Sequence, residues 1–267
     1  MASPQVIVLG SGNVASHLLE AFVAAQVSCG LWSRDCGHAR TLAARVGDDK
    51  VEVFDCLADV PRDSFCYVIA VSDNAVAALI EELGSVEGVV AHTSGSVPLQ
   101  EPFADGRYGV FYPLQTFSSD VSVDMSKVPF FVEGNNPAVT ELLKELAALF
   151  GANAYEADSL HRAQLHLAAV FASNFANSLW VVAEGILKDA GYPLDVLEPL
   201  LKETLRKAMA YGPRQAQTGP AARNDTKVLS RQMEELEGIP LEIYRLITEL
   251  IRSQQMPPDE TENKEIQ

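Results

Sequence analysis

The sequence predicts an α/β protein in which a doubly wound, mostly parallel sheet is followed by an all-helical C-terminal domain. Short apolar runs alternate with segments of helical periodicity over the first part of the chain, and this rhythm is typical of parallel strands joined by crossover helices. The first run ends in the glycine-rich turn "GSGN" and passes directly into a helical segment. Beyond residue 158 the strand pattern stops. We therefore predict domains at 1–157 and 158–253 and a disordered tail at 254–267.

The strands of the first domain are predicted from short apolar runs bounded by turns. The run at 64–72 is apolar almost throughout, as in a strand that helices cover on both faces. Between the runs, apolar residues recur at helical spacing, most clearly in 138–151. The expected strands are 5–10, 27–34, 50–55, 64–72, 88–95, 109–117, 128–135 and 152–158, and the expected helices are 12–26, 36–47, 74–85 and 138–151.

Residues 159–191 contain no proline and are predicted to form one long helix. Nearly every face of this helix carries apolar or small side chains, so we expect neighbours in the same chain or a second subunit to bury most of it. A homodimer through the helical domain is the predicted assembly. Further helices are expected at 193–212, 225–236 and 240–255. The polar end of the chain is expected to be disordered.

Composition narrows the classes of partner. The 267 residues carry a formal net charge of −16, which argues against nucleic acid, because phosphate contacts need clustered Lys and Arg. No apolar run approaches the roughly 18 to 20 residues that cross a bilayer, and no signal peptide precedes the first strand, so no membrane contact is expected. The cysteines form no CxxC pair and are interpreted as reduced thiols of a cytoplasmic protein; they are Cys29, Cys36, Cys56 and Cys66.

The turn after the first strand matches the dinucleotide-binding pattern G-x-G-x-x-A. Gly10 allows the tight turn, Gly12 lets the backbone approach a diphosphate, and Ala15 lets the helix pack closely on the sheet. The helix would present its free N–H groups and the positive end of its dipole to the phosphates. An empty Rossmann-like domain with a glycine-rich turn is the alternative. The predicted cofactor contacts here are Gly10, Ser11, Gly12, Asn13 and Val14.

The end of the second strand favours NADP over NAD. An NAD site usually has an acidic residue there to bind the ribose 2′-hydroxyl. Here the positions read Ser33 and Arg34, and a hydroxyl followed by a guanidinium suits the 2′-phosphate of NADP. Asp35 comes one residue late and is expected to cap the next helix. An ordinary surface arginine is the alternative for Arg34.

The end of the fourth strand supplies three further cofactor candidates. Val71, Ser72 and Asp73 stand where the chain turns back, and they are predicted to approach the nicotinamide ribose. A plain helix cap by Asp73 or Asn74 is the alternative.

Two later strand ends supply substrate candidates, because ligands gather at the carboxyl ends of parallel strands. Ser94 belongs to "HTSGS" at 92–96, which is predicted to bind substrate oxygen atoms; a polar turn is the alternative. Pro113 takes the chain out of the sheet, and Gln115 beyond it is predicted to face the substrate.

The stretches "GSGNVASHL", "HTSGS", "GVFYPLQTFS", "HLAAVFASNFANSL" and "TGPAARND" together resemble a bacterial family with a Rossmann-like NADP-binding domain and a helical domain of unknown function, whose members are labelled NADP oxidoreductases. The resemblance covers nearly the whole chain. More distantly, the layout is similar to pyrroline-5-carboxylate reductases, 3-hydroxyisobutyrate dehydrogenases and deazaflavin-dependent NADP reductases. It implies hydride transfer between NADP(H) and a small carbonyl or imine compound, with a helical domain that completes the site, usually in a dimer.

The resemblance does not carry over a catalytic lysine. The hydroxyacid dehydrogenases place a lysine one turn before an asparagine on the long helix, and Asn174 matches that asparagine. Val170 stands at the lysine position, and no lysine occurs between Lys144 and Lys188. His166 is a replacement proton donor, because the eight residues that separate it from Asn174 leave both on one broad face of an α-helix.

The catalytic candidates are thus His166 as proton donor and Asn174 as the group that orients the substrate oxygen; a packing role is the alternative for both. Asn177 is predicted to face the substrate, because a buried amide without partners is costly. His92 is the second choice of proton donor. No metal is predicted, since His161 and His166 are five residues apart and no acid lies at ligand spacing.

The stretch "TGPAARND" at 218–225 is a third cluster of candidates. Thr218 and Arg223 are predicted to close over an anionic substrate, with Arg223 binding a carboxylate in bidentate fashion. Asn224 or Asp225 is expected to cap the helix that follows. A capped loop without a ligand is the alternative.

These patterns predict an NADP-dependent oxidoreductase that acts on a small molecule. The alternative is a sensor or scaffold that binds NADP without turnover, since the lysine is absent and a fold does not determine a function. An imine reductase of the proline-biosynthesis type is a third hypothesis.

Overall fold

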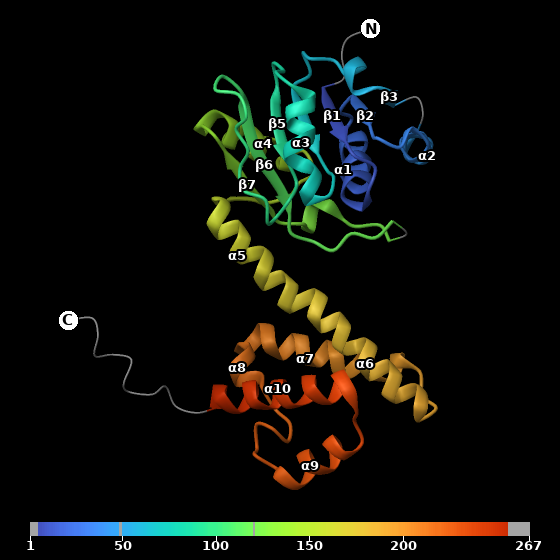
Figure 1. The fold of residues 1–267 in the computed structure, drawn as a ribbon, viewed down its shortest axis with the longest axis vertical. Helices are drawn as coiled ribbons and strands as arrows, with labels where there is room; N and C mark the ends of the chain where they lie inside the picture. The colour runs from blue at the N-terminus through green and yellow to red at the C-terminus, as the bar shows by residue number, and fades with distance from the viewer. Residues whose placement is uncertain (1–4, 48–49, 120, 256–267) are drawn as a thin grey trace, which may run out of the picture. The chain divides into compact units, whose positions relative to one another are not determined.

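The computed structural model describes residues 5–47, 50–119 and 121–255 and confirms the predicted fold class. Eight strands form one sheet in the order β3-β2-β1-β4-β5-β6-β7-β8. Figure 1 shows this sheet with helices packed against it. Neighbouring strands pair in parallel except β6 and β7, which are antiparallel. The strands are Val6–Leu9 (β1), Cys29–Trp32 (β2), Val51–Phe54 (β3), Cys66–Ile69 (β4), Val89–His92 (β5), Arg107–Pro113 (β6), Phe130–Gly134 (β7) and Ala154–Glu156 (β8).

Helices cover both faces of this sheet. They are α1 (Asn13–Ala24), α2 (Cys36–Val46), α3 (Asp73–Leu83) and α4 (Pro137–Ala148). Successive strand residues point to opposite faces, so Val6 and Val8 pack in the core under α1, α2 and α4, whereas Ile7 and Leu9 pack in the core under α3. The strand order reverses between β1 and β4, which is where ligands bind in doubly wound sheets.

The long helix is continuous from Ser159 to Asp189, but its middle is not α-helical. It consists of α5 (Ser159–Ala169), the π-helical segment η3 (Val170–Phe175) and α6 (Ala176–Asp189). A π-helix has more residues per turn than an α-helix. The spacing argument that places His166 and Asn174 on one face assumes an unbroken α-helix, so this shared face stays a prediction.

Internal packing divides the chain into two units, Met1–Phe175 and Ala176–Gln267. The division falls inside the long helix, whereas the boundary predicted at residue 157 precedes it and stays a prediction. The predicted tail begins at Gln254, which belongs to the last helix, and residues 256–267 lie outside the described residues. The second unit is helical as predicted and contains α6, a 3₁₀ turn (Leu194–Leu197), α7 (Glu198–Tyr211), α8 (Pro213–Ala216), α9 (Thr226–Glu234) and α10 (Gly238–Gln255).

The long helix is exposed in the single chain. Its apolar side chains include Leu167, Phe171 and Phe175, which are exposed by 57, 63 and 50%. The expectation that neighbours in the same chain bury the long helix is therefore wrong. The alternative, burial by a second subunit, remains. The helix also has the length and composition to cross a membrane, with a mean hydropathy of 1.3 over its most apolar window. That corrects the expectation of no such segment, although helices of water-soluble proteins meet the same criterion.

Candidate functional site

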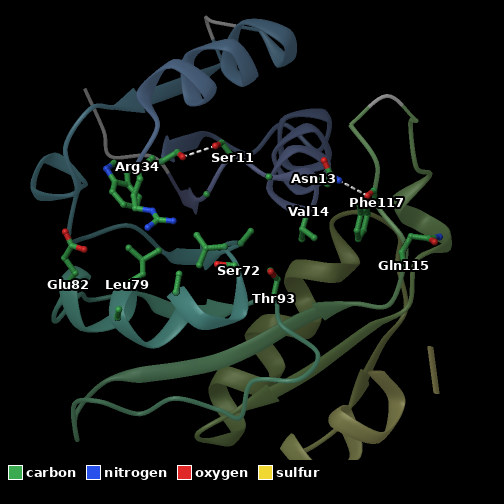
Figure 2. Close-up of a pocket in the computed structure, with 18 residues that line it drawn as sticks. Ser11, Asn13, Val14, Arg34, Ser72, Leu79, Glu82, Thr93, Gln115 and Phe117 are labelled. Carbon is green, nitrogen blue, oxygen red and sulfur yellow. Dashed lines mark hydrogen bonds between the residues drawn. The ribbon is translucent and has the colours of Figure 1, made fainter. Parts of the chain in front are cut away.

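A pocket of about 560 Å³ opens at the carboxyl ends of β1, β2 and β4 (Figure 2), a volume typical of cofactor sites. Figure 2 shows Arg34 and Glu82 at one end of this pocket and Gln115 and Phe117 at the other. Gln115, a predicted substrate ligand, lines it. The predicted cofactor residues also line it, with the exception of Asp73: they are Gly10, Ser11, Gly12, Asn13, Val14, Ser33, Arg34, Val71 and Ser72.

The two glycines of the turn have different roles. Gly10 has a φ of +132°, and a Cβ there would lie 2.2 Å from the carbonyl oxygen of Ala70, so only glycine lets β1 and β4 meet. Gly12 is the N-cap of α1 with an ordinary φ of −80°, and its Cβ would meet no atom within 4 Å. No side chain caps α1, and its first turn holds no acidic residue. The free N–H groups therefore face the pocket without a competing carboxylate, which is an arrangement that binds anions.

The end of β2 presents a cation to the pocket. Ser33 is buried and its hydroxyl bonds the hydroxyl of Ser11 at 2.8 Å, which ties the second strand to the glycine turn. Among the described residues Arg34 has no ion-pair partner. Asp35 caps α2 by accepting from the His38 N–H at 3.0 Å, as predicted. A free guanidinium beside a buried hydroxyl is suited to a phosphate group.

A loop after β6 is fastened to the start of α1. The Asn13 amide donates to the carbonyl of Phe117 at 3.0 Å. The His17 ring, buried in α1, lies 2.9 Å from the carbonyls of Asn13 and Val121 and packs on the Phe117 ring at 5.0 Å between centroids. These contacts hold the loop that carries Gln115 beside the glycine turn.

Asp73 and Ser94 point elsewhere. The Asp73 carboxylate accepts a hydrogen bond from the Ser96 hydroxyl. The buried Ser94 oxygen accepts from the backbone N–H groups of Ser96 and Val97, at 3.2 and 3.0 Å. Neither residue lines the pocket, whereas the adjacent Thr93 does. The polar-turn alternative thus describes what Ser94 does in this structure.

His92 is held neutral within the same turn. Its Nδ1 accepts from the Ser94 N–H at 3.3 Å, which leaves Nε2 to donate to the Pro98 carbonyl at 3.2 Å. Burial, assisted by the positive charge of Arg162, lowers the pKa of His92 to about 4. With both ring nitrogens occupied, His92 has no free proton to give, so the second choice of proton donor falls away.

His166 meets a residue that sequence analysis missed. Its Nδ1 lies 3.1 Å from the hydroxyl oxygen of Tyr112, at the end of β6. The two residues are 54 positions apart in sequence, so no local signal announces the pair. A buried ion pair also anchors α5: Arg162 is fully buried, bonds Glu133 of β7, and donates to the Val97 carbonyl at 2.6 Å.

The remaining predicted residues are exposed. Asn174 lies in the π-helical segment and Asn177 is the second residue of the second unit. Both are exposed, so the cost of a buried amide does not apply to them in the single chain. Thr218 lines an apolar groove of about 330 Å³ within the helical unit. Arg223 is exposed, and Asp225 caps α9 by accepting from the Val228 N–H at 3.2 Å, one of the two caps expected there.

A further pocket-lining set was missed although the sequence carries its signal. One face of α3 lines the pocket through Ala75, Ala78, Leu79 and Glu82, and this three-to-four-residue spacing is that of one helix face.

Within the described ranges, no three His, Cys, Asp or Glu side chains come together to hold a metal ion.

The comparisons identify a family. Residues 128–251 match the model of a domain of unknown function, DUF2520. A crystal structure from Bacteroides fragilis, described as a "putative NADP oxidoreductase", has 35% sequence identity and a TM-score of 0.85, over 94% of this chain and 98% of that chain. The chain therefore belongs to this family of NADP oxidoreductase-like proteins with a DUF2520 domain, as the resemblance implies. No curated protein matches the sequence.

Two more distant structures share the fold. A protein from Thermotoga maritima has 23% identity and a TM-score of 0.69, over 94% of this chain and 98% of that chain. A reductive aminase from Aspergillus terreus, solved with NADPH and ethyl levulinate, has 14% identity and a TM-score of 0.58, over 96% of this chain and 89% of that chain. These likenesses confirm the Rossmann-like fold.

Proposed function

We propose that the protein is an NADP-dependent oxidoreductase that transfers hydride between NADP(H) and a small carbonyl or imine compound. The observation that carries this proposal is one pocket lined both by the N-terminus of α1, which no side chain caps, and by Arg34, which has no ion-pair partner in the described part of the chain. A dinucleotide with an added phosphate has anionic groups for both ends of that arrangement. When bound, NADPH supplies the hydride.

The residues of the pocket divide the work of holding the cofactor. The N–H groups at Gly12, Asn13 and Val14 would bind the diphosphate, since the turn offers them without a competing acid. Arg34 would bind the 2′-phosphate with charge-assisted hydrogen bonds. The pocket also includes Thr93, next to the end of β5, and Gln115, which is a proposed substrate ligand.

His166 is proposed as proton donor to the reduced oxygen or nitrogen, and Asn174 as the group that orients the substrate oxygen. Asn177, Thr218 and Arg223 remain predicted substrate ligands. The imine class is supported by the names of structural neighbours, which include an imine reductase from Myxococcus stipitatus and a pyrroline-5-carboxylate reductase from Coxiella burnetii.

Calorimetric titration tests the cofactor. Wild-type protein should bind NADPH more tightly than NADH. Loss of a hydrogen bond to a charged group costs about 1.5 to 3 kcal/mol, so Arg34→Ala should weaken NADPH about 10- to 150-fold and leave NADH almost unchanged. Arg40→Ala is the matched control, because Arg40 pairs with Asp55 at 2.7 Å and lies outside the pocket. If Arg34→Ala weakens NADPH and NADH binding equally, Arg34 does not bind the 2′-phosphate. If the wild-type protein binds neither dinucleotide, the proposed function is refuted.

Turnover separates the enzyme from the sensor or scaffold. Consumption of NADPH is measured against carbonyl and imine compounds, including pyrroline-5-carboxylate. The enzyme hypothesis is supported if the protein reduces any compound of this panel and if His166→Ala slows that reduction without weakening the binding of NADPH. Tight NADPH binding with no turnover across the panel favours the sensor, which the absence of a lysine between Lys144 and Lys188 also favours.

A homodimer through the helical unit is part of the proposal. Of the apolar side chains described in this unit, only Ala221 and Leu229 are buried, while Trp180, Leu200 and Leu246 are exposed by 42, 61 and 66%. A second copy of the chain would cover such surfaces. Sedimentation showing a stable monomer at micromolar concentration would contradict it. A cytoplasmic location and the absence of nucleic-acid partners stay predictions.

A further inference from the structure

Tyr112 and His166 form a close pair at the end of the sheet. Tyr112 is 8% exposed, at the penultimate position of β6, and His166 lies on α5. The hydroxyl oxygen and Nδ1 are 3.1 Å apart, and the rings meet edge to face with centroids 6.0 Å apart. Both residues belong to the same compact unit as the dinucleotide pocket.

Gly95 makes room for this pair. A Cβ on Gly95 would lie 2.7 Å from Cζ of Tyr112 and 2.8 Å from Nδ1 of His166. No side chain larger than hydrogen can therefore occupy this position while the pair holds. Gly95 follows Thr93 by two residues, and Thr93 lines the pocket. The pair thus rests on the strand end that also forms the pocket wall.

The hydrogen bond has a defined direction. A phenol has one O–H donor, and a buried donor needs an acceptor. Among the described residues, Nδ1 of His166 is the only hydrogen-bond partner of the Tyr112 hydroxyl. The phenol therefore donates and Nδ1 accepts, which places the proton of a neutral His166 on Nε2. His166 is partly exposed, and its Nε2 has no partner within the described ranges.

Charges around the pair favour a protonated phenol. Burial raises the pKa of Tyr112, and the carboxylate of Asp73 acts in the same direction, while the nearby Arg162 cation opposes them. Arg162 stands one helical turn before His166 on the face of α5 that is fixed to the strand ends. The phenol thus remains a donor to the histidine ring.

We propose that His166 Nε2 is the catalytic proton donor and that Tyr112 is the positioning residue that keeps the proton on Nε2. This inference rests on the proposed function. Hydride forms the new C–H bond at the substrate carbon, and the electron pair of the C=O or C=N bond takes the Nε2 proton. The phenol proton moves to Nδ1 in the same step, so the imidazole stays neutral. Solvent then gives a proton to Nε2 while the Nδ1 proton returns to the Tyr112 oxygen, which restores the starting state.

Nitrogen-15 NMR of histidine-labelled protein tests the pair without any substrate. The chain has five histidines, and His166→Gln assigns the signals of interest. Wild-type His166 should show a protonated Nε2 and an unprotonated Nδ1. Tyr112→Phe and Gly95→Ala should each convert this to a mixture of tautomers. Tyr155→Phe, which removes a hydroxyl from a half-exposed tyrosine stacked on Phe131, is the matched control. An unchanged tautomer in Tyr112→Phe would overturn the positioning role.

Addition of NADP⁺ tests the placement. The His166 ring signals should move, while those of the exposed His161 should not. If calorimetry records NADP⁺ binding and the His166 signals stay fixed, the catalytic role is overturned and the cofactor proposal stands. If calorimetry records no binding, the proposed function fails and this inference fails with it.

Discussion

Replacing the two glycines of the turn one at a time separates the fold from the cofactor site. In Gly10→Ala the new Cβ would lie 2.2 Å from the Ala70 carbonyl oxygen at a φ of +132°. Relief of this clash must move β1 away from β4. The two strands are joined there by a hydrogen bond of 2.8 Å from the Ala70 N–H to the Leu9 carbonyl, and this bond would be lost. The positive φ costs an alanine about 1 to 2 kcal/mol, and one lost backbone hydrogen bond adds about 1 kcal/mol.

Gly10→Ala should therefore lower the free energy of unfolding by roughly 2 to 3 kcal/mol and the Tm of the sheet unit by roughly 4 to 12 °C. Gly12→Ala should change stability by less than about 1 kcal/mol, because Gly12 has an ordinary φ and open space around it. Its methyl group would stand where a diphosphate would meet α1, so NADPH affinity should fall at least ~10-fold, about 1.4 kcal/mol.

Thermal unfolding followed by circular dichroism, with calorimetric titration of NADPH, gives both quantities for each variant. Gly12→Ala with wild-type stability and weak NADPH binding is the expected result. If Gly12→Ala binds NADPH as tightly as wild type, the diphosphate does not lie on this turn. If Gly10→Ala is as stable as wild type, the close approach of β1 and β4 does not limit this position.

Two further predictions concern buried ionisable groups, namely His92 and the ion pair of Arg162 with Glu133. The pKa of His92 is lowered from 6.5 to about 4, so between these values the unfolded chain binds a proton that the folded chain does not, and stability falls by roughly 3 kcal/mol as the pH drops through this window. Urea unfolding at pH 7 and pH 4.5 should show a smaller difference in His92→Gln; an equal difference contradicts the assignment. Glu133→Gln leaves the buried Arg162 without its counter-charge and should cost roughly 3 to 5 kcal/mol. The double variant Glu133→Leu, Arg162→Met should cost less, and a larger loss there would contradict a desolvation penalty.

Most of the fold could be predicted because its signals are local. Strand and helix periods, the glycine turn and the helix caps each depend on residues a few positions apart, and the strands and principal helices appear where these patterns place them. The π-helical segment Val170–Phe175 has no such signal, since its composition suits an ordinary apolar helix. The exposure of the long helix also lay beyond sequence reasoning, because burial depends on what packs around it.

The features of the site also differ in whether they depend on nearby or on distant residues. That Gly10 to Val14 and Arg34 share one pocket could be predicted, because a motif of fixed spacing determines their place; the structure confirms them only as lining residues. The hydrogen bond of Asp73 could not be predicted, because its partner Ser96 lies 23 residues away. Tyr112 was missed for the same reason, since it meets His166 only after β6 and α5 pack together. Residues 75 to 82 of α3 could have been found from their helical spacing.

The packing of α5 explains how an exposed helix can still position a proton donor. Ser159, Arg162 and His166 share one face of α5, because they are three and four residues apart. The Ser159 hydroxyl bonds Glu133 at 2.9 Å and accepts from the Leu99 N–H at 3.0 Å, and Arg162 bonds Glu133 as well. These contacts fix the first turn of the helix to the strand ends before it reaches His166. The orientation of the His166 ring thus depends on contacts inside the sheet unit, so variants that disturb the exposed part of the helix should alter assembly before they alter the tautomer of His166.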